Sequence, residues 1–138
     1  MSRRPSPGTA PRAAPRAAPV AAPGAAPGAN YVPDAGDIVW LAFDPQSGHE
    51  QAGHRPAVVL SPAAYNGRTG LMLCCSTTTR IKGYPFEVAL AGTPASVALA
   101  DQIKSLDWRA RRTVRKGAAR PAELSLIRAR AQALLGGA

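Results

Sequence analysis

Residues 56–60 read Pro-Ala-Val-Val-Leu, a short and unbroken apolar run near the middle of the chain. A run of this length without polar alternation predicts a β-strand that is buried on both faces. Further stretches on either side of it are short, rich in apolar or β-branched residues, and separated by loops. They are Asp37–Phe43, Leu71–Ser76, Phe86–Leu90 and Ser96–Leu99. Five such strands predict a mainly β fold, a small antiparallel barrel or curled sheet.

Two segments outside these strands carry signals for a turn and for a helix. The segment Tyr65–Gly70 has Asn-Gly at its centre, a pair that favours tight turns. Pro121 suits the first position of a helix, and Gly136 suits its end. Between them, apolar residues recur at three- and four-residue spacing, at Leu124, Ile127, Ala131 and Leu134. We expect this C-terminal helix to close the barrel or to contribute to an oligomer contact, with its arginines on a solvated face.

The first 30 residues differ from the rest in composition. They contain seven of the 14 prolines, ten alanines, four arginines and no acidic residue. Proline recurs at every fourth position from Pro7 to Pro27, a spacing that a helix does not tolerate because each ring removes an amide donor. We therefore expect residues 1–30 to form a disordered Ala/Pro-rich tail and residues 31–138 to form one folded domain. The tail fits neither a signal peptide nor a transit peptide.

The expected folded part is basic and contains two cysteines. Its 13 Lys and Arg stand against eight Asp and Glu, a net charge of about +5, which favours a polyanionic partner. Cys74 and Cys75 are adjacent, so on a strand they would point to opposite faces and form no disulfide with each other. With no second cysteine cluster to hold a metal, a reducing cytoplasm fits best. No apolar run approaches the ~20 residues of a membrane span, so we expect a soluble protein.

Three polar clusters are candidates for a functional site. Residues 48–56 place a carboxylate, an amide, two imidazoles and a guanidinium in a glycine-punctuated loop between two strands, where binding and catalytic groups are commonly displayed. Residues 76–80 read Ser-Thr-Thr-Thr-Arg after a central strand, and residues 108–116 gather basic side chains around Trp108. Each cluster also has a plainer interpretation, as a surface loop, as ordinary strand threonines and as a solvated basic surface.

Several blocks of sequence carry a more specific indication. They are Tyr31–Asp37, Phe43–Pro45, Glu50–Pro62, Lys82–Val88, Val97–Ser105 and Trp108–Arg111. In this order the chain resembles the MazF/PemK family of toxin endoribonucleases from Tyr31 to about Gly136. The resemblance implies an SH3-like barrel with a C-terminal helix, a homodimer, and a cognate antitoxin that blocks the toxin and so relieves growth inhibition. It also implies metal-independent, sequence-selective cleavage of single-stranded RNA, leaving a 2′,3′-cyclic phosphate and a 5′-hydroxyl.

The resemblance also implies roles for individual residues. The family's loop arginine falls on Arg55, its loop glutamate on Glu50 and its catalytic threonine on Thr78, counting back from the block that begins at Lys82. A guanidinium suits stabilisation of charge on the phosphorane, and a hydroxyl can donate to a non-bridging oxygen. Glu50 is either a general base or a group that orients Arg55. His54 is an alternative proton carrier, or it contacts the RNA.

Further residues near these positions are candidates for RNA contacts. They are Gln51, Thr77, Thr79, Arg80, Lys82, Arg109 and Arg111. We expect no cofactor and no metal. Two alternatives remain open: a non-catalytic nucleic-acid-binding barrel, and a toxin on a related fold that acts through protein contacts. The joint presence of Glu50, Arg55 and Thr78 favours a ribonuclease, because a protein that only binds does not need that combination.

Overall fold

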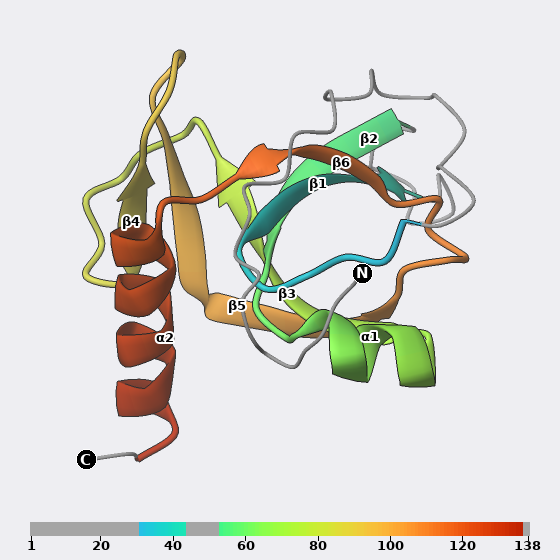
Figure 1. Cartoon of the computed structure of the whole chain (residues 1–138). Coiled ribbons are helices and arrows are strands. Elements are labelled where there is room, and N and C mark those ends of the chain that lie inside the picture. The colour runs from blue at the N-terminus through green and yellow to red at the C-terminus, as the bar shows by residue number, and fades with distance from the viewer. Residues whose placement is uncertain (1–30, 44–52, 137–138) are drawn as a thin grey trace.

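The computed structural model describes residues 31–43 and 53–136, which form a curled antiparallel sheet with two helices (Figure 1). The strands are β1 (Asp37–Phe43), β2 (Gly53–Val59), β3 (Leu71–Thr78), β4 (Glu87–Leu90), β5 (Ser96–Asp107) and β6 (Val114–Ala118). They lie in the order β4-β5-β3-β2-β1-β6, and every neighbouring pair is antiparallel. The predicted mainly β fold is confirmed as a curled half-barrel. The expected tail, residues 1–30, lies outside the described residues.

The sheet curls along β5, which pairs with β3 in both of its halves and with β4 in its first half. Its first residues pair with β4, and its last residues pair with the start of β3. Between these parts the register with β3 shifts, since Thr77 lies opposite Ala98 whereas Cys75 lies opposite Ile103. The extra residues on β5 bend the strand, as irregularities of this kind do in antiparallel sheets. Figure 1 shows the bend, where β5 turns from the side of β4 to run beneath β3.

Strand alternation divides the buried side chains between two clusters. One cluster fills the hollow of the curled sheet, and it contains Val39, Leu41, Ala57, Val59, Met72, Cys74 and Trp108. The other lies on the opposite face of the sheet, beneath α2, and it contains Val58, Cys75, Val88, Leu90, Ala98, Ala100 and Ile127. The prediction for the adjacent cysteines is confirmed: both thiols are free and buried, and they belong to different clusters.

The segment expected to be a turn is instead the short helix α1 (Ala63–Thr69). Its Asn66 side chain is fully buried and donates from Nδ2 to the carbonyls of Pro33 (2.7 Å) and Ser61 (2.9 Å). A buried side-chain network of this kind outweighs the local preference of Asn-Gly for a turn. Gly70 ends the helix in the left-handed conformation (φ 76°), which a side chain would disfavour.

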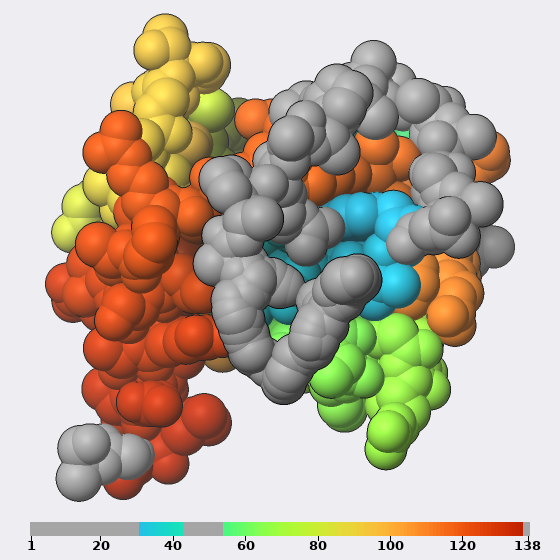
Figure 2. Space-filling view, in the orientation of Figure 1, coloured from blue at the N-terminus to red at the C-terminus, as the bar shows by residue number. Residues whose placement is uncertain are grey.

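The C-terminal helix α2 (Pro121–Leu134) is confirmed, with Pro121 at its first turn. The Glu123 carboxylate accepts the backbone N–H of Arg120 (2.8 Å), and the buried Ile127 and Ala131 face the sheet. Leu134, expected on the same face, is 48% exposed. Figure 2 shows α2 forming one side of the molecule, with α1 at the other side. Among the residues that the structure describes, no helix has the length and apolar character needed to cross a membrane.

The arginines of α2 are only partly on a solvated face. Arg128 is exposed, and its Nη2 donates to the carbonyl of Leu60 (3.0 Å). Arg130 is half-buried, and its Nη1 donates to the carbonyl of Pro85 (2.7 Å), which ties the helix to the loop between β3 and β4. Both bonds attach the helix to main chain elsewhere in the fold, so these side chains hold the helix in place.

Candidate functional site

Arg55 and Thr78 lie on the neighbouring strands β2 and β3, next to Pro56 and Thr77, which share a hydrogen bond. The pairing of β2 with β3 runs from Val59 opposite Cys74 to Ala57 opposite Ser76. Continued by two residues on each strand, this register sets Arg55 opposite Thr78. A hydrogen bond from the Thr77 hydroxyl to the Pro56 carbonyl (3.4 Å) shows that the strands stay together at this point. Residues opposite each other in an antiparallel pair share a face, so the guanidinium and the hydroxyl stand on the same side of the sheet.

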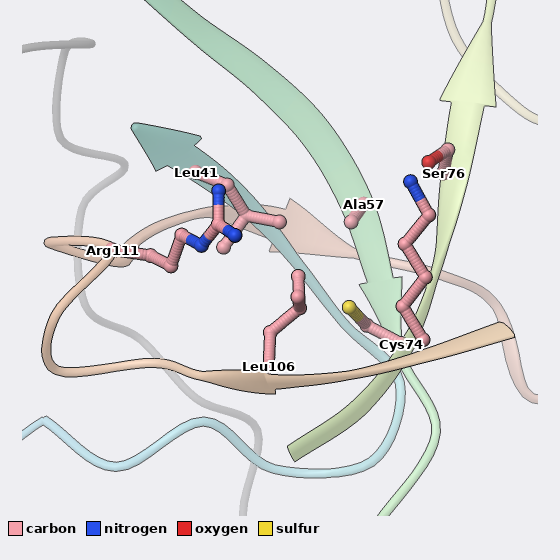
Figure 3. A pocket seen from close by; sticks show the side chains of 7 residues that line it. Leu41, Ala57, Cys74, Ser76, Leu106 and Arg111 are labelled. Atoms are coloured by element: carbon pink, nitrogen blue, oxygen red, sulfur yellow. The ribbon is translucent and has the colours of Figure 1, made fainter. Parts of the chain in front are cut away.

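That side is the hollow of the sheet. Arg55 is also opposite Leu41 of β1, whose side chain is buried in the hollow. A pocket of about 60 Å³ opens there, beside Ala57 and Ser76, the residues two positions away from Arg55 and Thr78 on the same strands (Figure 3). It is lined by Leu41, Ala57, Cys74, Ser76, Lys104, Leu106 and Arg111. Arg55 and Thr78 therefore stand beside a pocket that has both apolar walls and cationic side chains.

The three consecutive threonines differ in the face that they occupy. By strand alternation, Thr78 shares the face of Cys74 and Ser76, which is the face of the hollow. Thr77 shares the face of Cys75, which is the opposite face of the sheet. Thr79 lies beyond the end of the strand. The Thr78 Oγ1 accepts the backbone N–H of Arg80 (3.0 Å), which fixes the side chain and leaves its O–H as a donor. Of the three hydroxyls, that of Thr78 is the one aligned with Arg55.

The other residues of the β1–β2 segment divide into two groups. His54 neighbours Arg55 on β2, opposite Ala42, so strand alternation turns its imidazole to the face away from Arg55. Glu50 and Gln51 belong to residues 44–52, which lie outside the described residues. Within the described part of this segment, Arg55 alone points toward the hollow together with Thr78.

The loop between β3 and β4 carries two further candidates, Arg80 and Lys82, and both are exposed. The Glu87 carboxylate accepts the backbone N–H groups of Lys82 (3.0 Å) and Gly83 (2.8 Å). The Lys82 Nζ lies 5.9 Å from the centre of the Tyr84 ring, within reach of a cation–π contact. These contacts hold the backbone of the loop after Thr78 in one conformation, while the basic side chains of the loop remain exposed.

Arg109 and Arg111 belong to one turn but lie in different surroundings. The guanidinium of Arg109 stacks over the Trp108 ring, 4.4 Å from its centre, and lies next to Gly70 at the first end of β3. Arg111 reaches into the pocket beside Leu41, as Figure 3 shows. Its carbonyl accepts the N–H of Ala42 (2.9 Å), which fixes the turn against β1. The structure thus places Arg111 near Arg55 and separates Arg109 from it.

Cys74 lines the pocket, and its thiol is protonated at neutral pH. Burial raises its pKa from 9.0 to about 11, and the nearby charges of Lys104 and Arg111 oppose that rise. The pKa of Cys75 is raised by burial, and less by its neighbours Cys74 and Asp101, to about 12. A thiolate is the nucleophilic form of cysteine, so both residues act as small buried side chains in the core.

Comparison with known proteins identifies the family. The model of the PemK-like, MazF-like toxins of type II toxin–antitoxin systems matches residues 34–135. The chain belongs to this family. The endoribonuclease toxin MazF of Escherichia coli (strain K12) is 58% identical over 109 residues, which are 78% of this chain and 98% of that protein.

Solved structures of MazF agree with this assignment. A crystal structure of MazE–MazF from Deinococcus radiodurans matches at 55% identity and a TM-score of 0.74, over 79% of this chain and 100% of the other. A crystal structure of MazF from the same organism matches at 56% identity and a TM-score of 0.69, over 78% and 99%. The sequence-based prediction of an endoribonuclease toxin of the MazF/PemK family is confirmed.

The toxin also has pocket residues that sequence reasoning missed. Ser76 belongs to the candidate cluster 76–80 but was given no role, and Lys104 and Leu106 were not candidates, although Val97–Ser105 is one of the family-like blocks. Lys104 lies opposite Cys74, and Leu106 lies opposite Met72. The signal in the sequence was the two-residue period that places 104 and 106 on one strand face, and it was overlooked because the strand was expected to end at Leu99.

Proposed function

We propose that this toxin cleaves single-stranded RNA by attack of a ribose 2′-hydroxyl on the adjacent phosphorus, which leaves a 2′,3′-cyclic phosphate and a 5′-hydroxyl. The observation that carries the proposal is the alignment of Arg55 and Thr78 on one face of neighbouring strands. A guanidinium and a hydroxyl at that spacing can donate to the non-bridging oxygens of one phosphate. Such donors stabilise the charge that develops on the phosphorane.

The proposed roles follow from the chemistry of each group. Arginine keeps its proton in proteins, so Arg55 stabilises charge and does not transfer a proton. Thr78 donates its O–H to a non-bridging oxygen while its oxygen accepts the Arg80 N–H. Because His54 lies on the other face of β2, Glu50 is the better candidate for the group that removes the 2′-hydroxyl proton.

The proposed contacts with the remaining RNA come from the surroundings of this pair. Arg111 lies at the pocket, and Thr79, Arg80 and Lys82 stand on the loop that follows Thr78. Basic side chains of this kind bind the phosphate backbone and make affinity depend on salt concentration. Arg109 and Thr77 point elsewhere and are not part of this proposed RNA surface, whereas Gln51 belongs to the loop that carries Glu50.

The proposal extends to the setting of the toxin. The family description assigns its members to type II toxin–antitoxin systems, and one similar crystal structure contains MazF together with MazE. We accordingly propose a cognate antitoxin, a homodimer and action in the cytoplasm, where messenger RNA is available. A protein partner with an acidic segment would suit a basic RNA-binding surface.

The test is to map the cut ends of a mixed pool of transcripts and to determine their end chemistry. A 2′,3′-cyclic phosphate and a 5′-hydroxyl at short recurring sequences are expected. A matched oligonucleotide with 2′-deoxyribose at the scissile position should bind and remain intact, because the nucleophile is missing. A chelator should leave the rate unchanged, since no step uses a metal. Binding of RNA without cleavage would refute the proposal in favour of a non-catalytic binding barrel.

A further inference from the structure

The loop between β3 and β4 connects the Thr78 hydroxyl to the carboxylate of Glu87, the first residue of β4. Near the start of the loop, the backbone N–H of Arg80 donates to Thr78 Oγ1 (3.0 Å). Further along, the backbone N–H groups of Lys82 (3.0 Å) and Gly83 (2.8 Å) both donate to the Glu87 carboxylate. Figure 1 shows the loop passing from the end of β3 to the start of β4. One short stretch of backbone is therefore held at one end by the hydroxyl and at the other end by the carboxylate.

The strand register places Glu87 and Thr78 on the same face of the sheet. Thr78 lies opposite Val97 of β5, and Val97 lies opposite Ala89 of β4. Residues that lie opposite each other share a face, and so do residues two positions apart on a strand, as Ala89 and Glu87 are. Val88, which lies between them, belongs to the cluster beneath α2 on the other face. Glu87 thus stands on the side of the sheet that carries the Thr78 hydroxyl.

The backbone of the loop has a shape that suits a carboxylate. Gly83 has a φ of 82°, a left-handed conformation that residues with a side chain rarely adopt. A left-handed residue in a turn lets successive N–H groups converge on one anion. Hydrogen bonds to an ionised carboxylate are roughly twice as strong as those between neutral groups. Glu87 therefore holds the two N–H groups more firmly than a neutral side chain would.

The negative charge of Glu87 is unfavourable for binding RNA. Arg80 and Lys82 of the same loop are exposed and basic, and both belong to the proposed RNA surface. A carboxylate beside these cations weakens their attraction for phosphates. Its contribution to the reaction is therefore to be sought in the geometry of the loop and not in a contact with the substrate.

The Thr78 hydroxyl depends on this loop for its orientation. A threonine side chain has more than one accessible staggered rotamer, and the bond from the Arg80 N–H stabilises one of them. Because that N–H occupies a lone pair of Oγ1, the O–H is directed away from the loop backbone. Without the carboxylate, the backbone at Lys82 and Gly83 is free to shift. The Arg80 N–H then leaves Oγ1, and the hydroxyl rotates.

We propose that Glu87 is a positioning residue of the cleavage reaction, which holds the β3–β4 loop so that the Arg80 N–H keeps the Thr78 hydroxyl directed toward the scissile phosphate. The inference rests on the proposed function, because that function gives Thr78 its role at the phosphate. Glu87 itself touches neither the RNA nor the reacting atoms. Its loss should lower kcat and leave the affinity for RNA unchanged or higher, since a negative charge leaves the basic surface.

The test is a double-mutant cycle of Glu87→Ala and Thr78→Ala, with kcat and KM measured on one short RNA that contains a cleaved site. Glu87→Ala should lower kcat by about fivefold, the usual effect of one lost hydrogen bond, and KM should not rise. In the Thr78→Ala background the same change should lower kcat by less than about twofold, because the hydroxyl that Glu87 positions is gone. Glu87→Gln keeps one carbonyl acceptor and should recover part of kcat.

Glu123→Ala is the matched control. The Glu123 carboxylate also accepts two backbone N–H groups, those of Ala91 (2.7 Å) and Arg120 (2.8 Å), but it does so at the start of α2. Its removal should lower the melting temperature and leave kcat unchanged. Thermal melts establish that each variant is folded, and Glu87→Gln replaces Glu87→Ala in the cycle if the alanine variant does not fold.

Three results would overturn the positioning role and leave the proposed function standing. They are an unchanged kcat in Glu87→Ala, the same fall of kcat in both backgrounds, and an equal fall in Glu123→Ala. A wild-type toxin that cuts no RNA of a mixed transcript pool, or a Thr78→Ala variant as active as the wild type, would contradict the proposed function. The positioning role would then fail with it.

Discussion

The two ends of β3 use the same kinds of side chain for different purposes. At its first, N-terminal end, the Trp108 indole N–H donates to the carbonyl of Asn66 (2.8 Å), and Arg109 stacks on the Trp108 ring. At its last, C-terminal end, Thr78 accepts a backbone N–H of the following loop, and the exposed Arg55 stands on the neighbouring strand β2. An arginine and polar side chains occur at both ends. Those of the first end anchor the helix α1 and the tryptophan ring, whereas those of the last end belong to the proposed catalytic site.

This contrast shows that basic residues near an aromatic ring do not by themselves mark a binding surface. The cluster around Trp108 looked like an RNA contact in the sequence, but Arg109 is engaged with the tryptophan that anchors α1. The end with the proposed catalytic groups has no buried aromatic anchor of this kind among the described residues. Substitutions at the first end should therefore affect stability, and substitutions at the last end should affect cleavage.

The largest expected effect is that of Arg55→Ala. Loss of the guanidinium removes charge stabilisation at the phosphorus, and kcat/KM should fall by about 10²–10³-fold, as when one donor to a developing oxyanion is removed. Because Arg55 is exposed, the melting temperature should change little. The matched variant is Arg109→Ala, which should cleave at nearly the wild-type rate. A reversal of the two results would refute the division of roles between the ends of β3.

Thr78→Ala should reduce kcat/KM by about tenfold, because one hydrogen bond to a charged group is lost. Thr78→Ser keeps the hydroxyl and should retain most of the activity. Thr77→Ala is the control, since this side chain faces the other side of the sheet. Cleavage rates of the three variants on one RNA check the assignment. An effect of Thr77→Ala as large as that of Thr78→Ala would show that the register was misjudged by one residue.

Asn66→Ala should act on stability alone. It leaves the buried carbonyls of Pro33 and Ser61 without their amide donor, which should lower the free energy of unfolding by about 2–3 kcal/mol. Chemical denaturation measures this change, and cleavage per folded molecule should stay the same. Thr69→Ala, at an exposed position of the same helix, should cost well under half as much. Equal losses in the two variants would argue against the buried network as the reason for α1.

The smallest expected effect is that of Arg112→Gly. Arg112 has a φ of 52°, a left-handed conformation that costs a side-chain-bearing residue roughly 1 kcal/mol. Glycine relieves this strain but makes the unfolded chain more flexible, so the free energy of unfolding should rise by only about 0.5 kcal/mol. Ala110→Gly, in the same turn but without positive φ, should lower it by a similar amount. Opposite signs of the two changes, measured by denaturation, are the expected outcome.

The sequence predicted those parts of the fold that depend on local pattern. Asp37–Phe43 is a strand with the expected bounds, and Pro121 begins the C-terminal helix. The errors occurred where contacts between residues far apart in the sequence determine the structure. β5 was expected to end at Leu99, but it continues to Asp107 because its polar second half pairs with the first half of β3. β6 was overlooked within a basic segment, because its pairing with β1 is visible only in three dimensions.

The candidate site was likewise predicted in part from the sequence, whereas the orientation of its side chains required the structure. The family-like blocks led to Arg55 and Thr78, and the strand register then set these two residues on one face. The sequence did not show that His54 and Thr77 point to the opposite face, because this requires the positions of both strands. Lys104 was missed because it lines the pocket through its pairing with Cys74, in a part of β5 that was not expected to be a strand.

Cys74 and Cys75 are joined by one peptide bond, yet they lie in different clusters of buried side chains. A larger side chain at position 74 would intrude on the pocket in the hollow of the sheet, whereas one at position 75 would disturb the packing under α2. Substitutions at two adjacent positions therefore have separate consequences, the first for the shape of the pocket and the second for the attachment of α2 to the sheet.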